Sequence, residues 1–166
     1  MKMSRAEFQA LVLRAARGAK VPLSQAGEFA ALLRSLVEAD LKALLPVALA
    51  ALNTDRSPPE VEETANGWSI AGSDPMQSIP AALDFAQSGA VAVHEFDDLM
   101  IHWAKFRGFA ASPEGLQETP VPDPAKGHVK IEAQQYDALM ALAARTYVPA
   151  TAASRSGAGA GDIDND

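Results

Sequence analysis

Apolar residues recur with the period of an α-helix through most of the first fifty residues, which restricts that part of the chain to helices. Residues 4–17 show the pattern best, because one face of the expected helix carries Phe8, Leu11, Val12 and Ala15. Ser4 and Glu7 have the spacing of a capping box at its start. Gly18 is placed to end this helix in a left-handed turn.

Two further helices are expected before residue 54. The second begins around residues 22–24, and its apolar stripe consists of Phe29, Leu32, Leu33, Leu36 and Val37. The third has Asp40 as its candidate N-cap, and its stripe consists of Leu41, Leu44, Leu45, Ala48, Leu49 and Leu52. Because Pro46 lacks a backbone N–H, we expect a kink or break near Leu45. Residues 1–53 therefore form the predicted helical part.

The rest of the chain mixes strand and helix patterns. Residues 54–67 are polar and contain prolines, and they form the predicted connection to a mixed part over residues 68–150. Residues 68–72 resemble a short strand, and Pro80 opens a helix that ends at Gly89. Residues 90–96 are predicted to be a strand, and residues 99–106 alternate well enough to be its hairpin partner.

A helix over Asp98–Phe106 is the alternative to that second strand. Leu99, His102, Trp103 and Phe106 would then share one helical face. The strand is favoured because residues 97 and 98 are both aspartate, a turn-forming residue type. Both tryptophans, Trp68 and Trp103, are assigned to core packing in a chain with few aromatic residues.

Residues 112–127 contain four prolines and are predicted to be an extended loop. Residues 128–132 suit a last strand, and residues 133–145 a final helix whose apolar face carries Tyr136, Leu139, Met140 and Ala143. The predicted architecture is a single α+β domain over residues 1–166. It has a helical N-terminal half, a small antiparallel sheet, a closing C-terminal helix and an extended segment at residues 151–166.

Composition excludes several functional classes. The chain has no cysteine, which rules out disulfides, a thiol nucleophile and thiolate metal sites. Its net charge of −7 argues against a nucleic-acid partner, although Arg5, Arg14, Arg17 and Lys20 form a basic stretch that we interpret as a solvated helix face. No apolar run is long enough to span a membrane, and the amphipathic start is unlike a signal peptide. A cytoplasmic location without membrane contact is expected.

The histidines offer one candidate metal site. If residues 90–106 form a hairpin, His94 and His102 approach each other across its two strands. Carboxylates at residues 95, 97 and 98 lie nearby, and imidazole with carboxylate suits zinc, iron or manganese. A metal-assisted hydrolase or lyase is therefore the alternative function. Ordinary strand residues without a metal are the simpler interpretation of the same pattern.

The C-terminal residues SRSGAGAGDIDND, 154–166, are the second candidate site. Asp162, Asp164 and Asp166 have the spacing that opens an EF-hand loop, but the later ligands of such a loop are missing. The glycine run is too close to the terminus for the strand and helix of a dinucleotide-binding unit. Its backbone N–H groups could still hold an anion beside Arg155, notably those of Gly157, Gly159 and Gly161. A disordered terminus is the simpler interpretation of the same composition.

The two ends of the chain together resemble a bacterial family catalogued as a domain of unknown function. The matching stretches are LRAARGAKVPLSQAGEFA at residues 13–30, AARTYVPA at 143–150, SR at 154–155 and GAGAGDIDND at 157–166. The family pattern has glycine where this chain has Lys20, and differs also at Thr151 and Ala153. The resemblance implies no activity and no cofactor. It does imply that the C-terminal segment is part of the fold.

The leading hypothesis is a small-ligand-binding or accessory interaction protein whose C-terminal segment folds back onto the domain. Arg14 and Arg17 are the expected counter-charges for the terminal aspartates. The predicted binding residues are Arg17, Ser154, Arg155, Gly157, Gly159, Gly161, Asp162, Asp164, Asn165 and Asp166. A third hypothesis is an accessory subunit whose Ala- and Leu-rich helices pack in a homo-oligomer or against another protein.

Overall fold

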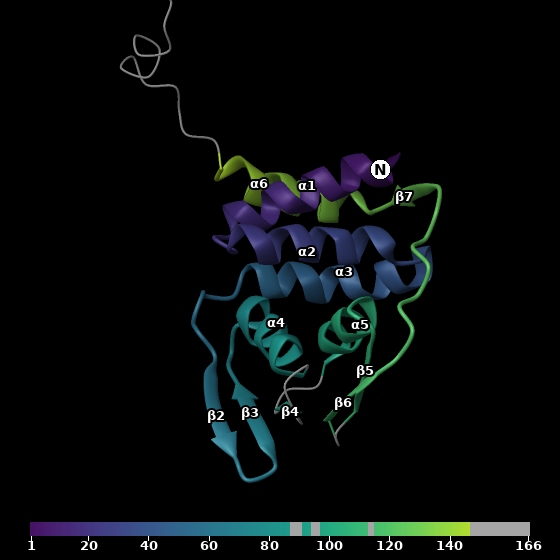
Figure 1. Ribbon diagram of the computed structural model, residues 1–166. Helices are drawn as coiled ribbons and strands as arrows, with labels where there is room; N and C mark the ends of the chain where they lie inside the picture. Colours follow the sequence, from purple (N-terminus) through teal and green to yellow (C-terminus); the bar gives the residue numbers. More distant parts are fainter. Residues whose placement is uncertain (87–90, 94–96, 113–114, 147–166) are drawn as a thin grey trace, which may run out of the picture.

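The structure is a computed structural model that describes residues 1–86, 91–93, 97–112 and 115–146. It confirms the α+β class, with six helices and seven short strands among these residues. The helices form three layers, in which α1 and α6 lie above α2 and α3, and these lie above α4 and α5 (Figure 1). The strands form three small sheets rather than the single antiparallel sheet expected.

Helix α1 (Arg5–Gly18) begins as the sequence predicts. The Ser4 hydroxyl accepts from the Glu7 backbone N–H at 3.2 Å, and the Glu7 carboxylate accepts from the Ser4 N–H at 2.7 Å. These hydrogen bonds from Ser4 hold the pKa of Glu7 below its usual value. Each bond satisfies a backbone or side-chain group that the helix start would otherwise leave to water.

The end of α1 differs from the prediction, because the left-handed residue is Lys20 and not Gly18. The backbone φ of Lys20 is 63°. Its N–H donates to the carbonyl of Arg17 at 2.9 Å, and the N–H of Val21 donates to the carbonyl of Ala16 at 3.0 Å. This pair of bonds is a Schellman motif, which closes the helix two residues later than expected.

Gly18 instead allows two helices to touch. A Cβ added at Gly18 would lie 1.8 Å from the carbonyl oxygen of Leu142 in α6 (Ala133–Ala144). No real side chain fits that distance, so the backbones of α1 and α6 are in direct contact. The apolar face of α6 includes Leu139, Leu142 and Ala143, whereas Met140, expected on this face, is 41% exposed.

Helices α2 (Leu23–Ser35) and α3 (Glu38–Leu52) occupy the predicted regions with shifted ends. Leu36 and Val37 lie between the helices, and Val37 rather than Asp40 is the N-cap of α3. Of the kink or break expected near Leu45, the break is wrong, because α3 continues through Pro46. Pro46 lies on the exposed side of α3, where the carbonyl that loses its partner faces water.

Arg5 is buried, which corrects its assignment to a solvated helix face. It is 9% exposed, and its guanidinium donates to the carbonyls of Arg34, Leu36 and Lys126. Two of these carbonyls belong to the end of α2, and the third belongs to the loop that leads to β7. Arg5 therefore holds α1, the end of α2 and this loop together.

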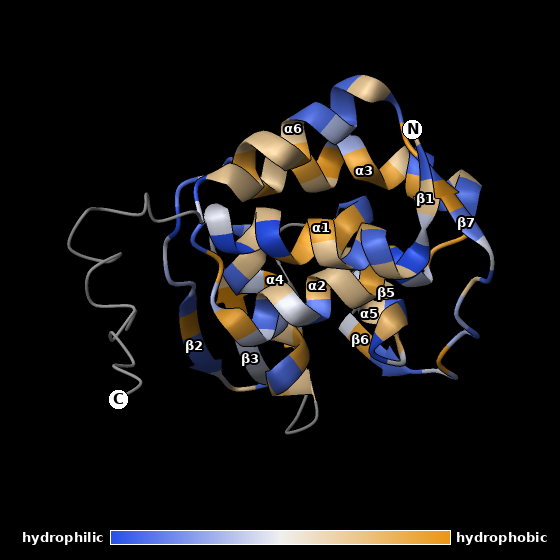
Figure 2. Cartoon of the chain, turned by 90° about the horizontal axis from the view of Figure 1, so that it is seen from above, coloured by the Kyte–Doolittle hydropathy of each residue, from blue (hydrophilic) through white to orange (hydrophobic). Residues whose placement is uncertain are grey.

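The predicted connection at residues 54–67 contains a strand that sequence patterns missed. Strand β2 (Glu60–Thr64) pairs antiparallel with β3 (Gly67–Ala71), and β4 (Val91–Val93) pairs parallel with β3. All five residues of β2 are exposed, so it has no apolar alternation to reveal it, and it is mainly hydrophilic in Figure 2. Helix α4 (Pro75–Ala86) starts before Pro80, the start expected from the sequence.

The predicted hairpin partner at residues 99–106 is wrong, because Asp98–Phe106 forms helix α5. The Asp97 carboxylate caps this helix by accepting from the Met100 N–H at 2.8 Å. Packing decides between the two alternatives, since a helix buries the whole apolar face at once. That face consists of Leu99, Met100, Trp103 and Ala104.

Three more short strands also escaped prediction. Strand β6 (Gly115–Glu118) lies inside the expected loop at residues 112–127 and pairs with β5 (Phe109–Ser112). Strand β1 (Lys2–Ser4) pairs with the predicted last strand, β7 (His128–Lys130). Each is only three or four residues long and depends on a partner for its hydrogen bonds.

A half-buried ion pair ties the middle layer to the lower one. The Trp103 indole N–H donates to Glu28 of α2 at 2.7 Å, and Arg107 donates to both oxygens of the same carboxylate. Arg107 also pairs with Asp84 of α4. Hydrogen bonding to Glu28 raises the pKa of Arg107 above its usual value. The assignment of both tryptophans to packing is confirmed, since Trp103 is buried and Trp68 stacks 4.6 Å from Phe85.

The contact at Gly18 predicts opposite effects of two Gly→Ala substitutions. Gly18→Ala should destabilise the fold by about 1–3 kcal/mol or more, because α6 must move away to make room for the methyl group. Gly27→Ala in α2 meets nothing within 4 Å, so it should stabilise the fold by about 0.5–1 kcal/mol through helix propensity. Urea denaturation measures both variants, and equal stability of Gly18→Ala and the parent chain would contradict the contact.

Candidate functional site

A surface hollow of about 690 Å³ lies where three helices end. The last residues of α1 and α3 contribute to its wall, together with the turns that follow them and Arg145, the residue directly after α6. The volume lies within the range of ligand sites, about 300–1,000 Å³. Its lining consists of Arg17, Gly18, Ala19, Lys20, Leu52, Asn53, Thr54, Asp55, Arg56 and Arg145. We call it the basic hollow.

Three of its four cations are free to meet a ligand. Arg17, Lys20 and Arg145 are exposed, and none of them forms an ion pair within the part of the chain that the structure describes. Asp55 is the only acidic residue among the described residues of the lining. The hollow therefore presents three exposed cations against one carboxylate.

The fourth cation, Arg56, has a structural role. Its Nη1 lies 3.0 Å from the carboxylate of Asp74, which is 1% exposed, and its Nη2 donates to the Ala51 carbonyl at 2.6 Å. A buried carboxylate that loses its partner is strongly destabilising. Arg56 is therefore committed to Asp74 and the end of α3, and contributes little net charge to the hollow.

The helix ends reduce the positive charge of the hollow without removing it. A helix C-terminus has a partial charge of about −0.5, so three of them offset about 1.5 positive charges. Part of the role of Arg17, Lys20 and Arg145 is thus to stabilise the helices that carry or precede them. The remaining positive surplus is small and exposed, which indicates weak and salt-sensitive binding of anions.

Lys20 holds its cation in the hollow at a conformational cost. A left-handed backbone costs an L-residue other than glycine, asparagine or aspartate roughly 1–2 kcal/mol. Glycine would be the low-cost choice at this position. The lysine is one of the three exposed cations of the hollow. Strain of this kind is often found at functional positions.

One of the predicted binding residues lies within the described ranges, and the others lie outside them. Arg17 lies in the basic hollow, as a counter-charge for an acidic ligand requires. Arg14 lines a different depression, beside Glu7, Tyr136 and Met140. The other predicted residues lie outside the described ranges: Ser154, Arg155, Gly157, Gly159, Gly161, Asp162, Asp164, Asn165 and Asp166.

The structure removes the basis of the predicted histidine site. His102 lies on α5 and not on a strand, and His94 falls outside the described residues. His102 lines a pocket of about 120 Å³ together with Asp40 and Asp123. Within the described ranges, no group of three His, Asp or Glu side chains is arranged to hold a metal ion.

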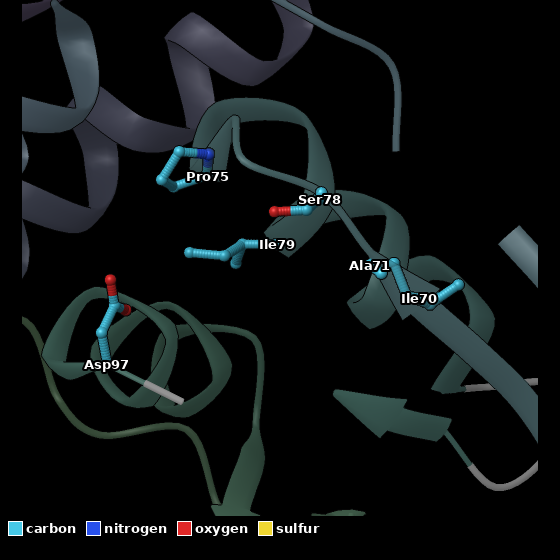
Figure 3. Close-up of a pocket in the computed structure, with 7 residues that line it drawn as sticks. Ile70, Ala71, Pro75, Ser78, Ile79 and Asp97 are labelled. Carbon is cyan, nitrogen blue, oxygen red and sulfur yellow. The ribbon is translucent and has the colours of Figure 1, made fainter. Parts of the chain in front are cut away.

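A second small pocket is enclosed by β3, α4 and the residue before α5 (Figure 3). Its volume is about 20 Å³, which is room for one water molecule. Ser78 and Asp97 are its polar side chains, and Asp97 already serves as the cap of α5. This pocket is therefore a packing feature and not a ligand site.

Comparison with known proteins adds no relative. No family model matches the chain, and neither a curated protein nor a solved structure matches it. The resemblance of its two ends to an uncharacterised family therefore stays a prediction. In the described part of the chain, no helix is long and apolar enough to cross a membrane.

Sequence reasoning found Arg17 but missed the rest of the basic hollow. Lys20 and Arg145 are separated by 125 positions, and only the contact of α1 with α6 brings them together. The sequence signal for Lys20 was the departure from glycine in the family pattern. Arg145 could have been noticed as a cation at the end of a predicted helix.

Two substitutions of Lys20 separate its backbone role from its charge. Lys20→Gly and Lys20→Ala both remove the cation, but only glycine relieves the left-handed strain. The glycine variant should therefore be more stable than the alanine variant by about 1 kcal/mol in urea denaturation. Equal stability of the two variants would show that residue 20 is not held in this conformation.

Proposed function

We propose that the protein is an interaction protein that binds an acidic segment of a partner in the basic hollow. The supporting observation is the meeting of three exposed cations, from the end of α1, the turn after it and the end of α6, around one cavity. Arg17 and Arg145 carry guanidinium groups that suit carboxylates in planar, two-bond geometry. Lys20 adds a charge that is not tied to one orientation.

The character of the lining favours a peptide segment over a compact small molecule. Small-molecule sites are mostly apolar and bury most of their ligand. The basic hollow is lined chiefly by charged and polar residues, and none of its lining residues within the described ranges is aromatic. An extended acidic segment can place its carboxylates on these cations while its backbone stays in water.

The alternative of a metal-assisted hydrolase or lyase has little support from the described residues. Its two-strand arrangement of His94 and His102 required residues 99–106 to be a strand, and they form α5. The carboxylates that share a pocket with His102, Asp40 and Asp123, come from other elements than those expected. An interaction role accounts better for the exposed cations than catalysis does.

A binding measurement on the full chain tests the proposal. The probe is a fluorescein-labelled hexa-aspartate peptide, and its anisotropy is followed at low salt as protein is added. Replacing Arg17, Lys20 and Arg145 by alanine together should weaken binding about tenfold, because exposed ion pairs contribute about 0.2–1 kcal/mol each. Raising the salt concentration should also weaken binding of the probe to the parent chain.

Lys42→Gln is the matched control. Lys42 is an exposed cation near the start of α3, about 15 Å along the helix from the end that lines the hollow. Its replacement should change the affinity by less than about twofold, because it removes one positive charge from a surface away from the hollow. The proposal fails if the triple variant keeps the parent affinity, or if Lys42→Gln loses as much as the triple variant does. Thermal melting of each variant checks that the fold is kept.

The predicted homo-oligomer stays a separate hypothesis. Light scattering at the protein concentrations of the binding experiment would detect it. A change of mass on adding the probe would distinguish assembly from simple occupation of the hollow.

A further inference from the structure

We infer that the acidic end of this chain, residues 162–166, occupies the basic hollow and competes with the acidic segment of a partner. The inference rests on the proposed function, and it names the regulation of the same site. The occupant is thus a defined segment of the protein itself, with Asp162, Asp164 and Asp166 as the groups that meet the cations.

The chain leaves its last helix at the hollow. Arg145 lines the hollow, and Thr146 directly after it donates from its hydroxyl and its backbone N–H to the carbonyl of Ala143. These two bonds fix the point at which residues 147–166 begin. The fifteen residues from 147 to 161 can span at most about 50 Å, so the aspartates can reach every wall of the hollow.

Charge is complementary between this segment and the hollow. The aspartates stand at every second position, so in an extended conformation they project to the same side. Their number equals the number of exposed cations, Arg17, Lys20 and Arg145. No lysine or arginine follows Arg155, so nothing within residues 156–166 neutralises the aspartates.

Weak binding is sufficient when the ligand is tethered. The small positive surplus of the hollow indicates weak binding of an isolated acidic peptide. A short tether supplies a local concentration on the order of millimolar. The segment is therefore bound for part of the time, and a partner with further contacts can displace it.

The depression beside Arg14 is a poorer place for the same segment. It contains the cations Lys2 and Arg14 but also the carboxylate of Glu7. It lies toward the start of α1, whereas the chain leaves α6 at the end of α1. Both surfaces carry a positive surplus, and the position at which the chain leaves α6 favours the basic hollow over the site that pairs Arg14 with the aspartates.

Competition with the hexa-aspartate probe tests the inference on the full-length chain. The variant Asp162→Asn, Asp164→Asn, Asp166→Asn keeps the length and shape of the segment but removes its charge. It should bind the probe about two- to tenfold more tightly than the parent chain, because the competitor is lost. Ile163→Ser is the control in the same segment, and it should leave the affinity unchanged.

A synthetic peptide supplies the reverse experiment. The peptide of residues 157–166, added to the triple asparagine variant, should displace the probe at millimolar concentration. The same peptide with asparagine in place of its three aspartates should not. Displacement by both peptides to the same extent would overturn the role of the aspartates.

The outcomes separate the inference from the proposed function. Equal probe affinity of the parent chain and the triple asparagine variant overturns the inference and leaves the binding function intact. Failure of the probe to bind either chain overturns the function itself. Competition that weakens as the protein is diluted would come from the end of a second copy, and would overturn the intramolecular form of the inference.

Discussion

The contact between Gly18 and the carbonyl of Leu142 sets the arrangement on which the rest of the molecule depends. It exists because residue 18 has no Cβ, so that the backbones of α1 and α6 can touch. The two helices are separated by more than one hundred residues in the sequence, yet their C-terminal ends meet at one end of the fold (Figure 1). The meeting of these ends creates the basic hollow and brings the exit of the chain to it.

The cations with a structural role are buried or half-buried, whereas the cations available to a ligand are exposed. Arg5, Arg56 and Arg107 each bind groups of the fold, respectively the carbonyls at the end of α2, the buried Asp74 and the Glu28 carboxylate. These guanidinium groups hold the layers together and have little capacity left for a ligand. The three exposed cations of the hollow, Arg17, Lys20 and Arg145, have no such partners among the described residues, so they can meet a ligand.

Local sequence signals predicted the helices well. The capping box of Ser4 and Glu7 and the apolar stripe of α1 require only neighbours along the chain, and both appear in the structure. The prediction of strands failed where a strand forms only by pairing with a distant segment, as β1 forms by pairing with β7. Residues 98–106 suited either a helix or a strand, and the burial of Trp103 against Phe29, with ring centres 5.6 Å apart, selected the helix.

The sequence predicts less of the site than of the fold, and the reason is physical. Arg17 was found because its charge is visible on a predicted helix, but Lys20 and Arg145 join it only through tertiary packing. The predicted pairing of His94 with His102 depended on a strand that does not form. A site assembled from helix ends leaves no spacing motif in the sequence, because its members belong to different elements.

Paramagnetic NMR of the full chain tests the central claim most directly. The protein has no cysteine, so an Ile163→Cys variant carries a nitroxide label at one position only. The account predicts that the label broadens the backbone amide signals of residues 17–20 and 145 most strongly, and that high salt restores them. Unchanged signals at these residues, or stronger broadening on α5 and β6, would contradict it.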